Sequence, residues 1–159
     1  MMGMDECFER GMLRQGRPDA LKAEFSIKVS KEKLEEAKKL SAAGFHNVAL
    51  VIAYAAMFHA GRALLFNDGV MEKSHFCLIA YLREKYVPSG KLLSGIVSMM
   101  DSFREERHDV MYGLNGLQVK ESDAKEALEN AGKLIDEAEK LLQQAKKEAE
   151  EKEDDGTKE

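Results

Sequence analysis

The chain has 159 residues, 44% of them hydrophobic, a length that suits one domain with a single core and is short for two. Its formal net charge of −5 argues against a broad basic surface, so any nucleic-acid contact must be local. With two prolines, no tryptophan and long periodic runs of Ala, Leu, Glu and Lys, the composition indicates an all-α protein with almost no strand signal.

The N-terminal part of the chain predicts two helices. Residues 4–15 are typical of a short helix, and Pro18 suits the first position of a second helix that runs to about Ala43. Ser30 offers an alternative, because its hydroxyl can cap a fresh helix at that point. Gly44 ends the helix in either case.

The most apolar segment, Phe45 to Phe66, predicts a central helix whose small residues let neighbouring helices approach closely. It has about the length needed to span a bilayer, but it contains His59 and Arg62. A central arginine costs roughly 2.5 to 3.5 kcal/mol on membrane-insertion scales. We therefore expect a buried helix of a soluble bundle, with no membrane partner.

Two further helices are expected after the turn signal at residues 67–69, over about 72–86 and 91–112. The second ends at Gly113 and the loop 114–116.

The last helix is expected to start near Ser122, where apolar residues begin to repeat at intervals of three and four, a stripe that packs lengthwise on a bundle. Residues 150–159 are almost all charged and predict a disordered tail. The expected organisation is one helical domain of residues 1–149, with about five to six helices, followed by this tail.

The two cysteines, Cys7 and Cys77, are far apart in the sequence, and Cys77 lies in an apolar run. This placement favours a buried free thiol over a disulfide or a metal ligand, and it fits a reducing compartment. The N-terminus has neither the basic nor the apolar region of a signal peptide. We expect a cytoplasmic protein.

Arg107 falls in the middle of the apolar sector of the helix at 91–112. A guanidinium keeps its charge, so it needs a carboxylate, a carbonyl cluster, a dimer partner or a bound phosphate there. Two interpretations stay open. Arg107 either pairs with an acidic residue inside the bundle or contacts an anion or RNA at an interface.

His108 and Tyr112 lie four residues apart and share a neighbouring face of the same helix. The histidine is suited to proton transfer and the tyrosine to positioning a phosphate, although the spacing alone favours a solvated face with one aromatic residue. No metal-ligand pattern and no phosphate-binding glycine loop is present in the sequence.

The other histidines, His46, His59 and His75, stand isolated on apolar helices, as core or interface histidines do. Arg62 shares a face with His59, which either indicates an anion site or places an arginine that extends to the surface along its own stem.

Several segments of the chain follow one another in a characteristic order. They are Tyr54-Ala55-Ala56-Met57-Phe58-His59-Ala60 with residues 62–65 behind it, Ser74-His75, Lys85-Tyr86-Val87 with a following Gly-Lys, and Arg107 to Tyr112 before the final helix. With these segments the chain resembles the HEPN family (higher eukaryotes and prokaryotes nucleotide-binding domain) over about residues 5–145. It looks like the small prokaryotic branch of that family, which is encoded beside minimal nucleotidyltransferases.

The resemblance implies an antiparallel up-and-down helical bundle that forms a homodimer. Many family members are metal-independent ribonucleases of toxin or defence systems, with an arginine, a polar residue and, a few positions later, a histidine. Carried over here, Arg107 takes the arginine position, His108 the polar position, and Tyr112 stands where the histidine would be. A tyrosine, with a pKa near about 10, is a poor general base at neutral pH.

The resemblance therefore implies a nucleotide- or RNA-binding protein, a regulatory or toxin–antitoxin partner of a minimal nucleotidyltransferase that modifies Tyr112 with adenylate. The alternatives are a metal-independent endoribonuclease toxin and a bundle that only assembles with other proteins. The expected catalytic residues are Arg107, His108 and Tyr112, and the expected nucleotide-binding residues are Arg62, Arg104 and Arg107, without metal or cofactor.

Overall fold

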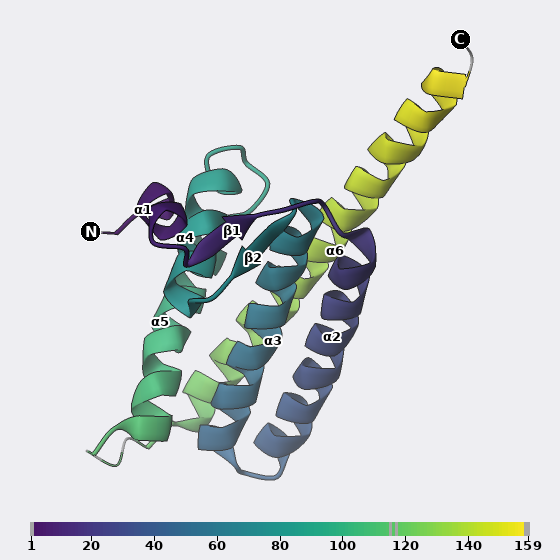
Figure 1. Ribbon diagram of the computed structural model, residues 1–159. Coiled ribbons are helices and arrows are strands. Elements are labelled where there is room, and N and C mark those ends of the chain that lie inside the picture. The colour runs from purple at the N-terminus through teal and green to yellow at the C-terminus, as the bar shows by residue number, and fades with distance from the viewer. Residues whose placement is uncertain (1, 115, 117, 158–159) are drawn as a thin grey trace.

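The computed structural model describes residues 2–114, 116 and 118–157, which fold into a helical bundle with one small sheet (Figure 1). Met1, Asn115, Leu117 and residues 158–159 lie outside the described residues, and with them part of the expected loop at 114–116 and the end of the expected tail. Within the described part the helices are α1 (Met4–Glu9), α2 (Ala20–Ala42), α3 (His46–Asn67), α4 (His75–Lys85), α5 (Ser94–Tyr112) and α6 (Glu121–Thr157). The all-α expectation is confirmed.

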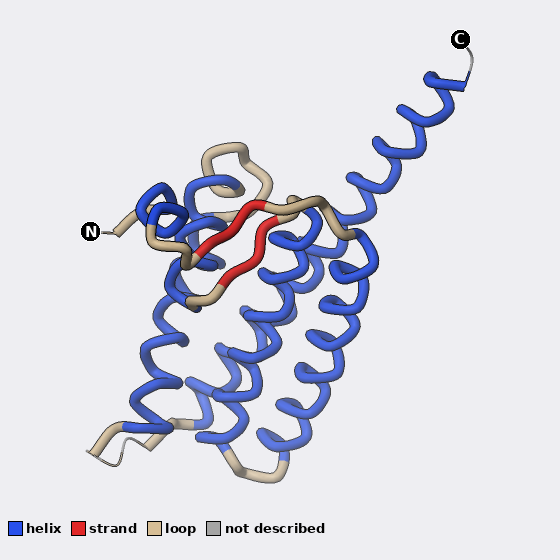
Figure 2. The backbone as a smooth tube through the Cα atoms, in the orientation of Figure 1, coloured by secondary structure: helices blue, strands red, loops and turns tan. Residues whose placement is uncertain are grey.

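Two short strands, β1 (Leu13–Gln15) and β2 (Val70–Glu72), form an antiparallel pair that the sequence did not predict (Figure 2). The expected first helix stops early because Gly11, two positions after the end of α1, adopts a left-handed conformation with φ of +72°. At the end of the ladder the amide of Gly16 donates to the carbonyl of Gly69 at 2.6 Å. A side chain on Gly69 would collide with this backbone, so the turn requires glycine.

Helix α2 is continuous, so the alternative of a fresh helix at Ser30 is wrong. Ser30 is buried and its hydroxyl donates to the carbonyl of Ile27 at 2.7 Å instead of capping a first turn. The cap is Asp19, whose side chain accepts from the amide of Lys22 at 3.0 Å.

Helix α3 is the central helix, and it packs against α2, α4, α5 and α6. At Gly61 a Cβ atom would lie 3.0 Å from methyl groups of Leu78 and Leu82, so the glycine permits a close approach of α4. By length and composition α3 is also able to cross a membrane, but most of its apolar window is covered by the bundle. The prediction of a buried central helix is confirmed.

Helix α6 runs along α3 and α2 and then projects beyond the bundle (Figure 1). It continues as a helix to Thr157, through most of the segment that the sequence suggested to be a disordered tail. Residues 150–156 are all exposed, so this part depends on the helix propensity of Glu and Lys rather than on packing. The boundary of the domain at residue 149 stays a prediction.

Cys7 and Cys77 form a disulfide, which corrects the expectation of free thiols. Their Cα atoms lie 5.8 Å apart because α1 packs across α4, a tertiary contact that local sequence patterns do not reveal. The cysteines therefore give no support to a reducing compartment.

Asp68, directly after α3, is held by two tyrosines from the region of α4. The hydroxyls of Tyr81 and Tyr86 donate to its Oδ2 atom at 2.9 and 2.7 Å. Burial raises the pKa of both tyrosines, and the neighbouring carboxylate raises it further. This cluster joins the end of α3 to the middle and the end of α4.

Candidate functional site

Arg107 lies on the face of α5 that meets α3, with its guanidinium carbon 5.6 Å from the centroid of the Tyr54 ring. Tyr54 is 1% exposed, and Arg107 is partly buried above it. Among the described residues no carboxylate forms an ion pair with Arg107. The arginine therefore rests on an aromatic face and keeps a charge that no acid of the described chain compensates.

Arg104, one turn earlier on the same face, is paired. Its Nε atom lies 2.9 Å from Oδ1 of Asp101, and its guanidinium lies 5.6 Å from the ring centroid of Phe76. Asp101 also contacts Arg83 at 3.4 Å, so one carboxylate serves two arginines. Together with Arg107, these side chains form a locally positive face on an acidic protein.

His75, the first residue of α4, belongs to this face, and the sequence did not identify it as a functional residue. Its Nδ1 atom and the hydroxyl of Tyr54 share a hydrogen bond of 2.9 Å. Phe58 stacks on its ring with centroids 4.1 Å apart. A possible signal was Ser74-His75 at a helix start, but no spacing in the sequence connects it with Arg107.

The pKa values of His75 and Tyr54 depend on the nearby arginines. Burial lowers the pKa of His75, and the positive charges of Arg107, Arg104 and Arg62 lower it further. Burial raises the pKa of Tyr54, an effect that Arg107 and Arg104 partly oppose. We call Tyr54, His75, Arg104 and Arg107 the arginine face.

Arg62 extends from α3 to β2, where its Nε atom lies 2.9 Å from Oε1 of Glu72. The Glu72 side chain is 5% exposed, and burial raises its pKa while Arg62 lowers it. The Arg62 guanidinium also contacts the rings of Phe58 and Phe66, at 5.9 and 5.1 Å. Arg62 is thus an ion-paired neighbour of the arginine face, one aromatic ring away from His75.

His108 and Tyr112 lie on another side of α5 from the Arg107 guanidinium. Both are exposed, Tyr112 at 63%, and their ring centroids are 5.2 Å apart. A single chain therefore brings Arg107 together with Arg104, Tyr54 and His75, and leaves His108 and Tyr112 to solvent.

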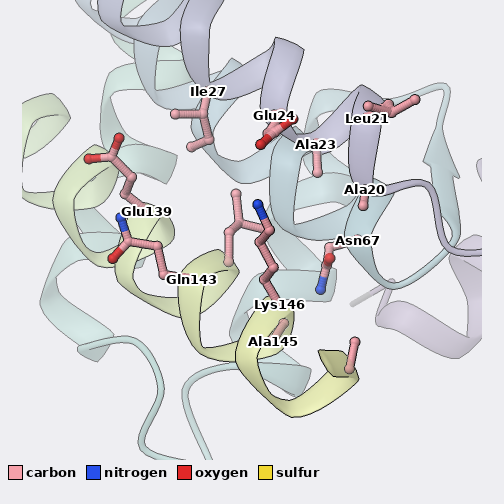
Figure 3. A pocket seen from close by; sticks show the side chains of 12 residues that line it. Ala20, Leu21, Ala23, Glu24, Ile27, Asn67, Glu139, Gln143, Ala145 and Lys146 are labelled. Carbon is pink, nitrogen blue, oxygen red and sulfur yellow. The ribbon is translucent and has the colours of Figure 1, made fainter. Parts of the chain in front are cut away.

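A groove of about 570 Å³ between α2 and α6 lies elsewhere (Figure 3). Leu21, Ile27 and Leu142 contribute apolar surface, and Lys146 extends from α6 toward α2. None of the predicted site residues lines this groove. In the part of the chain that the structure describes, no group of three or more His, Cys, Asp or Glu side chains is arranged to hold a metal ion.

Comparison with known families places the arginine face in context. The sequence model of the HEPN domain matches residues 23–141, a span that holds every residue of the arginine face together with His108 and Tyr112. No curated protein matches the chain. Because the match covers most of the chain and the fold is the helical bundle expected for it, this protein belongs to the HEPN domain family.

Proposed function

We propose that this HEPN protein binds a phosphate group of a nucleotide or RNA at the arginine face. The observation that carries the proposal is the partly buried guanidinium of Arg107, which lies on the Tyr54 ring and meets no carboxylate among the described residues. A phosphate supplies the missing negative charge and accepts the planar donor pattern of an arginine. Membership of the HEPN family supports a nucleotide- or RNA-related function.

The proposal extends to a homodimer. Met111, Tyr112 and Leu114 at the end of α5 are large apolar or aromatic side chains that are 48%, 63% and 101% exposed. Phe45 and Val48, at the start of α3, are exposed at the same end of the bundle (Figure 1). A two-fold contact at this end covers both sets. Light scattering at micromolar concentration is expected to show a dimer, and a monomer only would contradict it.

We further propose that the protein acts in the cytoplasm, with a minimal nucleotidyltransferase as its partner in a regulatory or toxin–antitoxin pair. The exposure of Tyr112 supports this setting, because a hydroxyl that receives adenylate must be accessible to the transferase. Incubation with such a transferase and ATP is expected to add adenylate to the wild type and not to Tyr112→Phe.

Binding is tested with the purified full chain and a short single-stranded RNA. Arg107→Ala is expected to weaken binding about ten- to 150-fold, since a charge-assisted contact to phosphate contributes roughly 1.5 to 3 kcal/mol. The matched control is Arg10→Ala, because Arg10 is an exposed arginine paired with Glu6 on α1. Equal affinity of both variants and the wild type would contradict the proposal.

The alternative function is a metal-independent endoribonuclease, and the observation in its favour is the exposure of His108, which follows Arg107 in the sequence. Because Tyr112 stands in the histidine position and a tyrosine is a weak base at neutral pH, we expect little or no cleavage by the protein alone. The assay is incubation with structured and single-stranded RNA in the presence of chelator. Strong cleavage that Arg107→Ala abolishes would favour the ribonuclease.

A further inference from the structure

The ring of His75 is fixed through its Nδ1 atom, and its Nε2 atom has no partner among the described residues. Its Nδ1 atom is bonded to the Tyr54 hydroxyl, and its ring is stacked on Phe58. The Nε2 atom has no hydrogen-bond partner among the described residues, and it is not fully buried. The ring is therefore fixed in orientation and leaves Nε2 partly accessible.

The charges around His75 leave a small positive excess. From α3 it faces His59 and Arg62, and from α5 it faces Arg104 and Arg107. Four arginines in this region (Arg62, Arg83, Arg104 and Arg107) are set against three carboxylates (Glu72, Asp101 and Glu105). With neutral His75 the excess is one positive charge, and with protonated His75 it is two.

This excess matches different phosphates in the two protonation states. A phosphodiester carries one negative charge and fits the site with neutral His75. A phosphate monoester carries about −1.5 to −2 near neutral pH and leaves negative charge uncompensated unless His75 takes up a proton. The Tyr54 hydroxyl permits this uptake, because it can donate to Nδ1 of the neutral ring and accept from Nδ1 of the protonated ring.

We propose that His75 is a phosphate-contacting residue of the arginine face, and that the site prefers a terminal phosphate monoester, as found on a mononucleotide or at the 5′ end of RNA. This inference rests on the proposed function and adds the class of phosphate. Nε2 donates to a phosphate oxygen beside Arg104 and Arg107, and binding of the dianion is accompanied by protonation of His75.

The affinity for a phosphate monoester depends on pH through His75. In the empty site burial and the arginines hold the pKa of His75 below its ordinary value, so the ring is neutral at neutral pH. A bound dianion opposes the arginines and raises this pKa. Affinity for the monoester therefore increases as pH falls from about 8 toward about 6.5, where the phosphate itself, with a second pKa of about 6, is still mostly dianionic.

The test compares the same short oligoribonucleotide with a 5′-phosphate and with a 5′-hydroxyl, at about pH 8 and about pH 6.5 and constant ionic strength. The wild type is expected to bind the phosphorylated form about five- to tenfold more tightly at the lower pH, and the hydroxyl form with less than about a twofold change. AMP and adenosine form a parallel arm. Tight binding of AMP assigns the site to free nucleotides, and preference for the oligonucleotide assigns it to RNA ends.

Variants separate the effect of His75 protonation from the effect of its hydrogen bond to the phosphate. His75→Gln keeps a donor near Nε2 but does not titrate, so it is expected to retain binding at the higher pH and to lose the pH dependence. His46→Gln, at the far end of α3, is the matched control and is expected to behave as wild type. Circular dichroism and thermal unfolding show whether each variant is folded, and Tyr54→Phe, which removes only the hydroxyl partner of His75, is expected to reduce the pH dependence independently.

Three results distinguish the ways in which the two proposals can fail. If both oligonucleotides bind with equal affinity and equal pH dependence, and Arg107→Ala weakens both, the monoester site is contradicted and the proposed function stands. If neither oligonucleotide nor AMP binds, both proposals are contradicted. Unchanged pH dependence in His75→Gln would overturn the role of His75 alone.

Discussion

Asp68 and Arg107 are two charged groups beside buried tyrosines, and the bundle surrounds them differently. The carboxylate of Asp68 accepts hydrogen bonds from Tyr81 and Tyr86. Arg107 lies over the ring of Tyr54, whose hydroxyl is bonded to His75 instead, and no acid of the described chain pairs with it. Asp68 therefore has its hydrogen-bond partners within the chain, whereas Arg107 has no acidic partner among the described residues.

The difference separates a structural role from a binding role. A charge whose partners belong to the same chain stabilises that chain and offers a ligand little, because its hydrogen bonds are already made. A charge that is partly desolvated without a partner makes the fold no more stable, yet gives an anion a prepared site.

The largest expected effect is loss of stability at high pH. Burial raises the pKa of Tyr54, Tyr81 and Tyr86 above the ordinary value of about 10, so these groups stay protonated in the folded state and ionise in the unfolded chain. Their contribution is complete below about pH 10 and is lost as pH rises further, by up to about 4 kcal/mol per pH unit for three protons. Urea unfolding at several pH values measures this slope.

The slope of the unfolding free energy against pH also distinguishes the Asp68 cluster from the arginine face. Replacing Tyr81 and Tyr86 together by Phe is expected to remove about two-thirds of it, and Tyr54→Phe about one-third. If the single replacement at the arginine face removes as much as the double replacement, the tyrosines of the Asp68 cluster ionise in the folded state and that cluster is more open than the structure indicates.

The second prediction concerns Asp68 directly. Asp68→Ala leaves two tyrosine hydroxyls without their acceptor and is expected to lower the free energy of unfolding by about 2 to 3 kcal/mol. Asp68→Asn retains an acceptor oxygen and is expected to lose less. Thermal and urea unfolding give the values, and RNA affinity of the folded variants should stay at the wild-type level. A loss of affinity in folded Asp68→Asn would remove the distinction between the two regions.

The third prediction is a small change of stability at Arg107. Arg107→Ala loses one cation–π contact, worth about 0.5 to 1 kcal/mol, and removes an uncompensated charge, which acts in the opposite direction. The free energy of unfolding is therefore expected to stay within about 1 kcal/mol of wild type or to rise. Arg104→Ala, which breaks an ion pair with Asp101, is the comparison. A loss above about 3 kcal/mol in Arg107→Ala would make Arg107 a structural residue.

The sequence predicted the elements whose information is local. Periodicity and turn residues located α3, α5 and α6, and the apolar stripe singled out Arg107 before its surroundings were known. The β1–β2 pair and the disulfide depend on segments distant in the chain, and no periodic pattern records such contacts.

The sequence did not identify His75 and Tyr54 as parts of the site for the same reason. His75 and Tyr54 are separated by a turn and a strand, and only the packing of α4 against α3 places them 2.9 Å apart. That Arg107 has no acidic partner among the described residues is likewise a property of the folded chain, because several acidic residues lie near it in sequence. The sequence left two interpretations of Arg107, with and without an acidic partner inside the bundle. The tertiary structure was needed to distinguish them.

The last prediction, with the smallest expected effect, asks whether Tyr112 joins the arginine face across a dimer. Tyr112 lies five positions after Arg107, which places the two about 140° apart on one helix, so one chain does not direct both at the same phosphate. A two-fold axis near α5 would let Tyr112 of one subunit reach the arginine face of the other. Dimers that combine an Arg107→Ala chain with a Tyr112→Phe chain are then expected to keep one intact site and about half of the wild-type RNA-binding capacity, because each site draws one residue from each subunit. Separately tagged chains allow the mixed dimer to be purified, and the two mutant homodimers are the controls. A capacity no higher than that of the homodimers would show that each site is built within one chain, and an unaffected Tyr112→Phe homodimer would leave the site to Arg104, Arg107, Tyr54 and His75 alone.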